Sequence, residues 1–378
     1  MTMSEPILVM TRRQFLAAGA LACARTAGPG WVRRRLGDAP LGVAVLGLGA
    51  WGCNWVDALA RPQRGVQLLT LADPRRMALD LGFHRAGAAG GAPVKALDDG
   101  GVLSDPNVSI VVVAAGEARN ARLARAACEA GKDVLLGGPL APEPASLLAL
   151  AGAAEASGRM VQHASGVLSN PRVQRVVGDR GEHARLGTVT RAELRVRTRT
   201  AALPLDPAAR AAAWLPAWCV HEIAAGLLGL GARGAAELFV AEGAEVDPRS
   251  GALAHSLYLS LRFDNQRELA LHLVAAPSGR TGAGRTAPPV AEVTLVLHGT
   301  AGRAHLHGAG AERPEQRVSA TDLLASWENL LDGVRHGDAG RLHAPIHEFA
   351  GAYEVLHAAR AGVVSYLGSR GSRAAKFL

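Results

Sequence analysis

The sequence has few aromatic residues, few cysteines and no long apolar run. Phe, Trp and Tyr make up 4% of 378 residues, and no basic stretch carries the interleaved aromatics on which bases stack, so we expect no nucleic-acid partner. The four cysteines show no CxxC or other metal-ligand spacing, so no metal site is predicted. The one leading apolar stretch is too short to span a bilayer, so we expect no integral membrane span.

Apolar and turn-forming residues are abundant instead. Hydrophobic residues make up 49% of the chain, which also contains 45 Gly and 20 Pro, as in a globular protein with many turns. A chain of this length can bury two sizeable cores without disulfide or metal support. We therefore expect at least two domains.

The positive charge is concentrated at the N-terminus. Of a formal net charge of +8, residues 1–35 carry +5. The pair Arg12-Arg13 precedes an apolar stretch through Ala24, which suits a signal h-region and resembles a twin-arginine export signal. We expect an exported or periplasmic protein. The alternative is a disordered basic leader on a cytoplasmic protein, because Arg25 interrupts the stretch and no small-x-small cleavage site follows.

From residue 40 to residue 160, buried strands alternate with helical segments. This pattern is typical of a parallel sheet covered on both faces, and it predicts a doubly wound α/β domain. The expected strands are Leu41–Leu46, Val66–Ala72, Ser109–Ala115 and Asp133–Leu136. The expected helices are 51–60, 119–130 and 143–157.

In the second half of the chain, the spacing of the apolar residues changes. Apolar and polar residues alternate there, which indicates an antiparallel sheet with one covered and one open face. The expected strands are 188–198, 255–263, 267–276, 290–298 and 304–307, and the expected helices are 214–230, 322–335 and 348–366. We therefore expect a C-terminal α+β domain with an open-faced, mainly antiparallel sheet.

A GxGxxG motif, Gly47 to Gly52, follows the first strand directly and begins the first helix. Gly47 permits the tight turn, Gly49 lets the backbone approach a pyrophosphate, and Gly52 allows helix and strand to pack closely. The helix N-terminus, with Ala50 and Trp51, then presents free amides to phosphates. The alternative is a glycine-rich turn that binds nothing.

Asp73 ends the second strand, 21 residues beyond Gly52. A carboxylate at that place accepts hydrogen bonds from the adenosine ribose and repels a 2′-phosphate, which favours NAD over NADP. Arg75 and Arg76 weaken that preference, so NADP is the alternative cofactor.

Several phrases together resemble the Gfo/Idh/MocA oxidoreductases. The resemblance implies a Rossmann half, an open-faced sheet half, bound NAD or NADP, and hydride transfer with a sugar or sugar-derived alcohol. Trp51 in the glycine loop is most similar to the branch acting on nucleotide-linked sugars. The phrases begin at Gly47, Leu71, Gly131, Asn170, Leu186, His221 and Val293.

The resemblance divides the chain and places further residues. Residues 1–35 are the leader, 36–160 the NAD(P)-binding Rossmann domain, and 161–378 the substrate and dimerisation domain. Ala115 and Asn120 fall on the nicotinamide side of the cofactor site. A small-molecule sugar or sugar nucleotide is the expected ligand, and the open sheet is the expected surface of a homo-oligomer.

The sequence also departs from the family at its catalytic positions. Gly138 stands where the family has the lysine of a Glu-Lys-Pro triplet, and Ala217 stands where it has an aspartate four residues before a histidine. His221 occupies that histidine position. It is either the remaining general acid and base or a hydrogen-bonded helix histidine. The protein is accordingly either an oxidoreductase with an atypical site or an inactive dinucleotide- or sugar-binding relative.

The remaining candidates are weaker. Arg191, Arg195, Arg197 and Arg199 share one strand face, where they would either clamp an anionic ligand or form a solvated charged face. His343 and His347 lie four residues apart, but Pro345 separates them and no third metal ligand is placed by spacing.

Overall fold

The computed structural model describes two compact units. The described residues are 8–9, 40–61, 63, 65–138, 144–177, 185–200, 206–216, 219–231, 236–246, 253–263, 265–277, 291–311 and 320–374. The nucleotide-binding unit comprises Ala22–Asn170 and Val318–Ala350, and the second unit comprises Met1–Leu21, Pro171–Arg317 and Gly351–Leu378. The predicted division at residue 160 differs from this, because Val318–Ala350 returns to the N-terminal unit. Of the expected leader, residues 1–7 and 10–35 lie outside the described residues.

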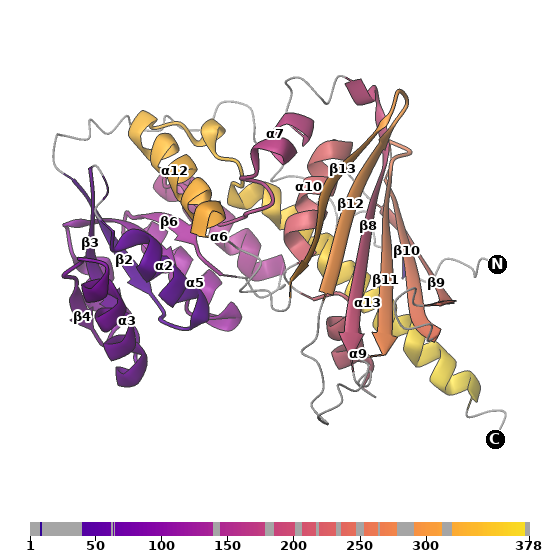
Figure 1. Ribbon diagram of the computed structural model, residues 1–378, viewed down its shortest axis with the longest axis horizontal. Coiled ribbons are helices and arrows are strands. Elements are labelled where there is room, and N and C mark those ends of the chain that lie inside the picture. The colour runs from indigo at the N-terminus through magenta and orange to yellow at the C-terminus, as the bar shows by residue number, and fades with distance from the viewer. Residues whose placement is uncertain are drawn as a thin grey trace. The chain divides into compact units, whose positions relative to one another are not determined.

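The nucleotide-binding unit contains a six-stranded sheet in the order β4-β3-β2-β5-β6-β7 (Figure 1). All its neighbouring strands pair in parallel. The strands are β2 (Leu41–Leu46), β3 (Val66–Ala72), β4 (Val94–Ala96), β5 (Val108–Val113), β6 (Asp133–Leu136) and β7 (Val161–His163). The chain runs outward from β2 on one side and then returns to β5 on the other, so a topological switch point lies between them. The predicted doubly wound α/β domain is confirmed.

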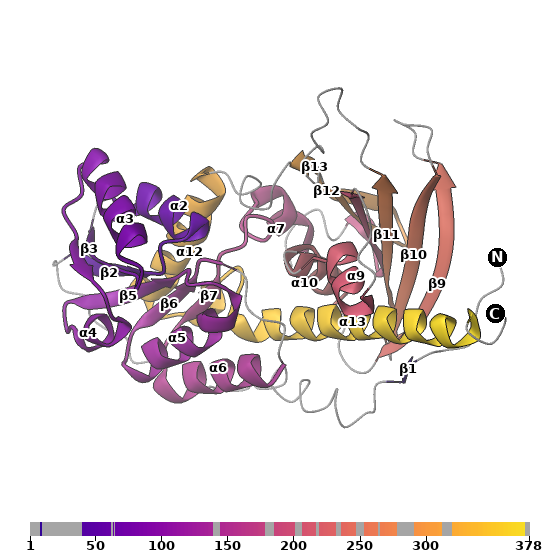
Figure 2. The ribbon, with the colours of Figure 1, turned by 90° about the horizontal axis from the view of Figure 1, so that it is seen from below.

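Helices cover both faces of this sheet. They are α2 (Ala50–Leu59), α3 (Arg76–Ala88), α4 (Asp99–Ser104), α5 (Glu117–Glu129), α6 (Pro144–Ser157), α12 (Ala320–His336) and the 3-10 turn η2 (Ala339–Arg341). The first face carries α2, α3 and α12, whose buried Trp55, Leu79 and Trp327 share one core. Figure 2 shows α5 and α6 on the opposite face. The helix α12 supplies Trp327 and Leu330 to the core under α2. Residues from a distant part of the sequence, nearly 300 positions after β2, therefore help to cover this face of the sheet.

The second unit contains a seven-stranded sheet in the order β1-β9-β10-β11-β8-β12-β13. Only β11 and β8 pair in parallel, and the other neighbours are antiparallel. The strands are β1 (Leu8–Val9), β8 (Val189–Thr200), β9 (Ala236–Val246), β10 (Leu253–Phe263), β11 (Glu268–Pro277), β12 (Ala291–Gly299) and β13 (Arg303–Ala311). The prediction of a mainly antiparallel second sheet is confirmed.

The two faces of this sheet differ in chemistry. Ala192, Leu194 and Val196 of β8 are buried, and the helix α10 (Val220–Leu230) packs on them, with Gly226 facing Ala192. The alternate residues of β8 are charged. Arg195 and Arg197 both donate to the carboxylate of Glu245, at 2.7 and 2.5 Å. Arg195 and Arg197 are therefore already paired with the carboxylate of Glu245 on β9.

The remaining helices are α7 (Pro171–Val177), α9 (Pro207–Trp214) and α13 (Ile346–Ala374), and α13 belongs to this unit from Gly351 onward. The single helix predicted over 214–230 is wrong, since α9 ends at Trp214 and α10 begins at Val220. Pro216 explains the break, because a proline disfavours helical backbone in the residue before it, and Leu215 has φ −123° and ψ 80°. Within the described ranges, no helix has the length and apolarity to cross a membrane.

Candidate functional site

A cavity of about 390 Å³ lies at the carboxyl ends of β2, β3, β5 and β6 in the nucleotide-binding unit. This edge of a doubly wound sheet, beside the switch point, is where such folds bind ligands. The residues around the cavity are Gly49, Ala50, Trp51, Asp73, Pro74, Arg75, Ala114, Ala115, Gly116, Arg119, Asn120 and Gly138. Six of the eight residues predicted to bind the cofactor are among them. Gly47 and Gly52 are buried and do not line the cavity.

The three glycines of the loop have different surroundings. Gly47 has φ +88°, a left-handed conformation that favours glycine, and a side chain there would overlap the backbone of Ala115. A side chain at Gly52 would overlap the carbonyl of Gly47. At Gly49, by contrast, no atom lies within 4 Å of the place a side chain would take. The loop therefore packs tightly at Gly47 and Gly52, whereas the side of the loop that faces the cavity is unobstructed at Gly49.

This open side fits the pyrophosphate of a dinucleotide. The helix α2 begins at Ala50, and its first hydrogen bond runs from the amide of Cys53 to the carbonyl of Gly49 at 2.9 Å. The three earlier amides of the helix have no intrahelical acceptor and mark its positive end. No acidic residue lies in the first turn. The bare Gly49 backbone and this helix end thus form an anion cradle.

Asp73 lies at the other end of the cavity, and each oxygen of its carboxylate accepts two hydrogen bonds. Its Oδ2 accepts from the amide of Leu48 at 2.7 Å, and its Oδ1 accepts from the amide of Arg75 at 2.9 Å. The guanidinium of Arg75 adds two bonds, from Nε to Oδ1 at 3.0 Å and from Nη2 to Oδ2 at 2.9 Å. Burial by itself raises the pKa of Asp73, but these bonds outweigh it, and the pKa lies below the ordinary value.

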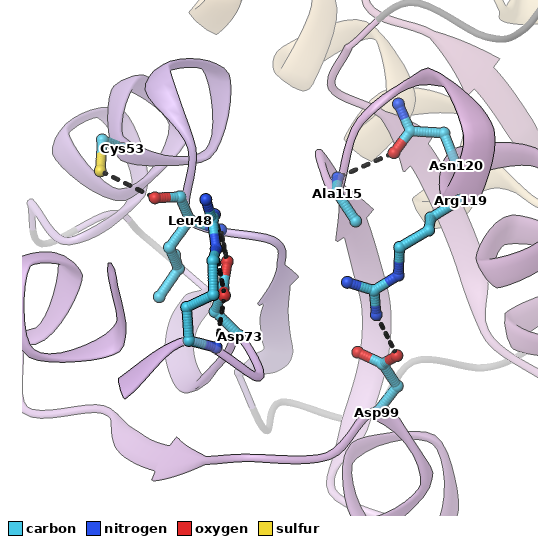
Figure 3. A network of polar contacts seen from close by, with 8 residues as sticks. Leu48, Cys53, Asp73, Asp99, Ala115, Arg119 and Asn120 are labelled. Atoms are coloured by element: carbon cyan, nitrogen blue, oxygen red, sulfur yellow. Dashed lines mark hydrogen bonds and ion pairs between the residues drawn. The ribbon is translucent and has the colours of Figure 1, made fainter. Parts of the chain in front are cut away.

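The opposite wall is formed by the start of α5. Arg119 pairs with Asp99 at 2.7 Å, and the side-chain oxygen of Asn120 accepts from the amide of Ala115 at 2.8 Å. Figure 3 shows these residues facing the side of the cavity that holds Leu48 and Asp73. The predicted pair Ala115 and Asn120 is therefore joined by a hydrogen bond that fixes the turn after β5.

The end of the cavity near β6 carries Gly137 and Gly138. A side chain at Gly137 would overlap the indole of Trp55, which is fully buried. At Gly138 the nearest atoms would be Asn120 Nδ2 at 3.4 Å and Trp51 Cγ at 3.8 Å, an ordinary van der Waals distance. Gly137 is therefore fixed by packing, whereas Gly138 has room for a side chain. Pro139 lies outside the described residues.

The described residues include Lys95 and Lys132, and both are engaged away from the cavity. Lys95 pairs with Asp80 and lies over the ring of Phe83. Lys132 is buried and donates to the carbonyls of Asp105 and Val108. Neither residue lines the cavity. The cavity therefore presents the cations of Arg75 and Arg119, and no primary amine.

His221 lies elsewhere in the chain. It is the second residue of α10, in the second unit, and it is partly buried. Ala217, four residues before it, lies outside the described residues. The residues predicted to bind the dinucleotide thus lie together in one unit, whereas His221, the predicted proton carrier, belongs to the other unit.

Sequence reasoning missed Arg119 and the role of the Leu48 amide. Position could have indicated Arg119, because it lies three residues after the turn that ends β5, and loops at the carboxyl ends of strands face the ligand. No three His, Cys, Asp or Glu side chains of the described residues could together hold a metal ion, and the absence of a metal site stays a prediction. The side chain of His347 is not among those described.

Known proteins resemble this chain in sequence over part of its length and in fold over most of it. Residues 41–165 match the Gfo/Idh/MocA family model, described as an oxidoreductase family with an NAD-binding Rossmann fold. A probable dehydrogenase from Thermotoga maritima superposes with a TM-score of 0.63 at 17% identity, covering 85% of this chain and 96% of that one. Among proteins with curated descriptions, none matches the sequence.

Two further solved structures resemble the chain and contain nicotinamide dinucleotide. The myo-inositol dehydrogenase from Lactobacillus casei, in complex with NAD(H) and myo-inositol, gives a TM-score of 0.63 at 14% identity, covering 84% and 93% of the two chains. GenD2 from gentamicin A biosynthesis, in complex with NAD, gives 0.59 at 20% identity, covering 89% and 96%. At these identities the likeness shows the fold. The match to the Gfo/Idh/MocA oxidoreductase family model, with its NAD-binding Rossmann fold, covers residues 41–165, which carry the glycine loop, Asp73 and Asn120.

Proposed function

We propose that the protein is an NAD(P)-dependent oxidoreductase that acts on a sugar or sugar-derived alcohol through an atypical active site. The observation that supports it best is the cavity at the switch point, where Gly49 leaves its side of the loop open below the start of α2. The polyol in the L. casei complex indicates the substrate class. When bound, the oxidised cofactor would supply the hydride acceptor.

The residues of this chain then have separate tasks. The amides at the start of α2 bind the pyrophosphate, and Asp73 holds the Leu48 amide and the Arg75 turn at the adenosine end. Asn120 fixes the Ala115 turn. We assign proton transfer to the imidazole of His221, because the other acid and base positions of the family are Gly138 and Ala217. A single general acid or base typically contributes a rate factor of about 10² to 10⁴.

The test is a substrate screen of the full chain. Sugars, polyols and nucleotide sugars are offered with NAD⁺ or NADP⁺, and absorbance of the reduced nicotinamide is followed. His221→Asn should abolish the turnover found. His357→Asn is the matched control, since His357 is an exposed histidine of α13 in the same unit. Equal turnover in both variants would remove His221 from the mechanism.

A second candidate is a relative that binds the dinucleotide without turnover. It is favoured by the cavity floor, where Gly138 contributes no side chain and neither described lysine reaches the cavity. Titration with NADH, followed by tryptophan quenching, separates the two candidates because Trp51 lines the cavity. Binding together with a wholly negative substrate screen would support the second candidate, and any nicotinamide turnover would exclude it.

We further propose export through the twin-arginine segment at Arg12-Arg13. The support is the sequence pattern alone. Cell fractionation of the full chain should find it outside the cytoplasm, and R12K/R13K should retain it inside. An unchanged distribution in the double variant would count against this route.

We also propose that the second sheet pairs two copies of the chain. Its charged face carries Arg191, which pairs with Glu268, and Arg195 and Arg197, which share Glu245. Much of the positive charge of this face is therefore balanced before it meets a partner. Light scattering coupled to gel filtration should give twice the mass of one chain. A single-chain mass at all concentrations would overturn the proposal.

A further inference from the structure

The nucleotide-binding unit carries a group of exposed apolar side chains on one side. Eight large hydrophobic side chains of the described residues are exposed, and five of the eight belong to residues 77–97. Their exposed fractions run from 39% for Phe83 to 87% for Met77. A single exposed apolar residue is ordinary, whereas a group of them usually marks an interaction site. The five are Met77, Leu81, Phe83, Val94 and Leu97.

The helix α3 carries part of this group on the side that faces away from its own core. Met77 and Leu81 are four residues apart, so they lie one turn from each other on the same helix face. Leu79 and Ala86 are buried on the other side of the helix. An amphipathic surface helix ordinarily carries polar residues where α3 carries Met77 and Leu81.

Lys95 connects α3 to the edge strand β4. Its Nζ lies 2.6 Å from Oδ1 of Asp80 and 4.4 Å from the centre of the Phe83 ring, both on α3. Val94 precedes Lys95 directly, and Leu97 follows it by two residues. Figure 1 shows α3 and β4 next to each other at one end of the sheet. The five apolar side chains therefore belong to one surface, which we call the α3–β4 surface.

An added strand is not the partner that this surface fits. β4 has only three residues, Pro93 before it has no amide hydrogen, and Lys95 lies at the sheet edge. Short length, proline and lysine are the features that keep edge strands from pairing. The other edge strand, β7, is covered within the chain, since the amide of His163 donates to the carbonyl of Ala344 at 2.9 Å. A partner at the α3–β4 surface would therefore pack through side chains.

The charges around the α3–β4 surface balance each other and indicate which partner fits. The whole chain has a formal net charge of +8, so two copies repel each other where the positive charge is in excess. Around this surface there is no such excess, and an anionic membrane or an acidic protein would gain little there. A second copy of the chain can approach at this place. Residues 76–98 contribute Arg76, Arg85 and Lys95 against Asp80 and Asp98, and Asp57 of α2 pairs with Arg85.

We propose that the α3–β4 surface is a self-association site, at which two copies of the chain pack this surface against itself about a two-fold axis. In such an isologous contact each copy contributes the same five apolar side chains and the same balanced charges. The site belongs to the nucleotide-binding unit and is separate from the open sheet of the second unit. Five side chains make a small contact, so it forms as the protein concentration rises.

Light scattering coupled to gel filtration, over a range of concentrations of the full chain, measures the contact. The mass of the parent should double as the concentration rises, starting from the one or two copies present at the lowest concentration. M77E/L81E brings four carboxylates together in the two-fold contact and should keep the low-concentration mass throughout.

A130E/A156E is the matched control, because it adds the same two charges elsewhere on the nucleotide-binding unit. Ala130 and Ala156 are exposed, and they lie at the end of α5 and within α6, on the opposite face of the sheet (Figure 2). The mass of this variant should double as the parent's does. Circular dichroism of both variants checks that they are folded.

A cross-link reports on the contact directly and does not depend on the glutamate variants. Leu81→Cys, treated with a short bismaleimide, should give a covalent dimer, because an isologous contact brings the two copies of position 81 close together. Ala156→Cys should give none. The described native cysteines, Cys53, Cys128 and Cys219, are buried, and the treated parent is the blank.

The outcomes separate this contact from pairing through the open sheet. Loss of the doubling in M77E/L81E, with a covalent dimer of Leu81→Cys, supports the α3–β4 contact whether or not the sheet also pairs. Doubling in M77E/L81E as in the parent, or no covalent dimer of Leu81→Cys, overturns the contact and leaves the sheet proposal standing. A parent with the mass of one chain at every concentration overturns both.

Discussion

The indole nitrogen of Trp55 donates a hydrogen bond of 3.0 Å to the carbonyl oxygen of Gly137, 82 residues away. The same ring fills the space that a side chain at position 137 would need. Gly137 is therefore packed against a large buried side chain of α2 and has no room for a side chain of its own. At the neighbouring Gly138, by contrast, a side chain would meet no atom closer than 3.4 Å.

The two glycines should respond differently to substitution. Gly137→Ala places a methyl group against Trp55 and should destabilise the protein by about 1–3 kcal/mol, the usual cost of overpacking a core. Gly138→Ala meets its nearest atom at 3.4 Å and should stay within about 0.5 kcal/mol of the parent. Urea unfolding of both variants checks this. Equal losses would mean that Trp55 moves aside.

The room at Gly138 also permits a gain-of-function variant. If the family lysine is the missing catalytic group, G138K/A217D should raise hydride transfer by about 10²- to 10⁴-fold over the parent, the usual contribution of an acid or base. Initial rates with NAD⁺ and each compound of the screen measure it in the parent and in every variant. Single variants without effect beside an active double variant would point to an inactive parent. No gain in any variant would place the defect outside these two positions.

Gly49 offers a way to remove cofactor binding without harming the fold. No atom lies within 4 Å of its absent side chain, which would point into the cavity. Gly49→Val should therefore lower NADH affinity at least about tenfold, because the pyrophosphate loses its close approach, and should leave the unfolding midpoint nearly unchanged. Gly52→Ala is the counterpart, since its methyl group overlaps the carbonyl of Gly47 and should destabilise the loop. Unaltered NADH binding by Gly49→Val would place the cofactor elsewhere.

Much of the fold could be predicted because the buried strands are strongly apolar. Three of the four strands expected in the first half, such as Val66–Ala72, have the predicted bounds. The short elements β4 and β7 were missed, because three residues carry too little pattern to stand out. The return of α12 to the first sheet could not be predicted, since its apolar stripe shows that it packs but not on which sheet.

Part of the cavity lining could also be predicted from the sequence. The glycine spacing and Asp73 follow a rule that is local in sequence, so the loop and the acid could be identified. The engagement of Asp73 by Arg75 and the packing of Trp55 on Gly137 depend on side-chain geometry, which spacing does not encode.

A buried glutamate on α13 should make the stability of the second unit depend on pH. Glu354 is 9% exposed, and its burial raises the pKa to about 7 from an ordinary 4.5. Between these values the folded state holds a proton that the unfolded state has released, so stability falls as pH rises through this window. The full penalty, about 3 kcal/mol at most, applies above the folded pKa and is absent below the unfolded one.

Glu354→Gln should remove this dependence. We expect the variant to be more stable than the parent at about pH 8 and to lose that advantage at about pH 4, where both side chains are uncharged. Urea midpoints across this range measure the difference. Glu237→Gln, at an exposed position of β9 in the same unit, is the control and should leave the slope unchanged. Parallel pH profiles for the parent and Glu354→Gln would mean that water or a rearranged neighbour solvates Glu354, and that α13 is less tightly packed there than its burial indicates.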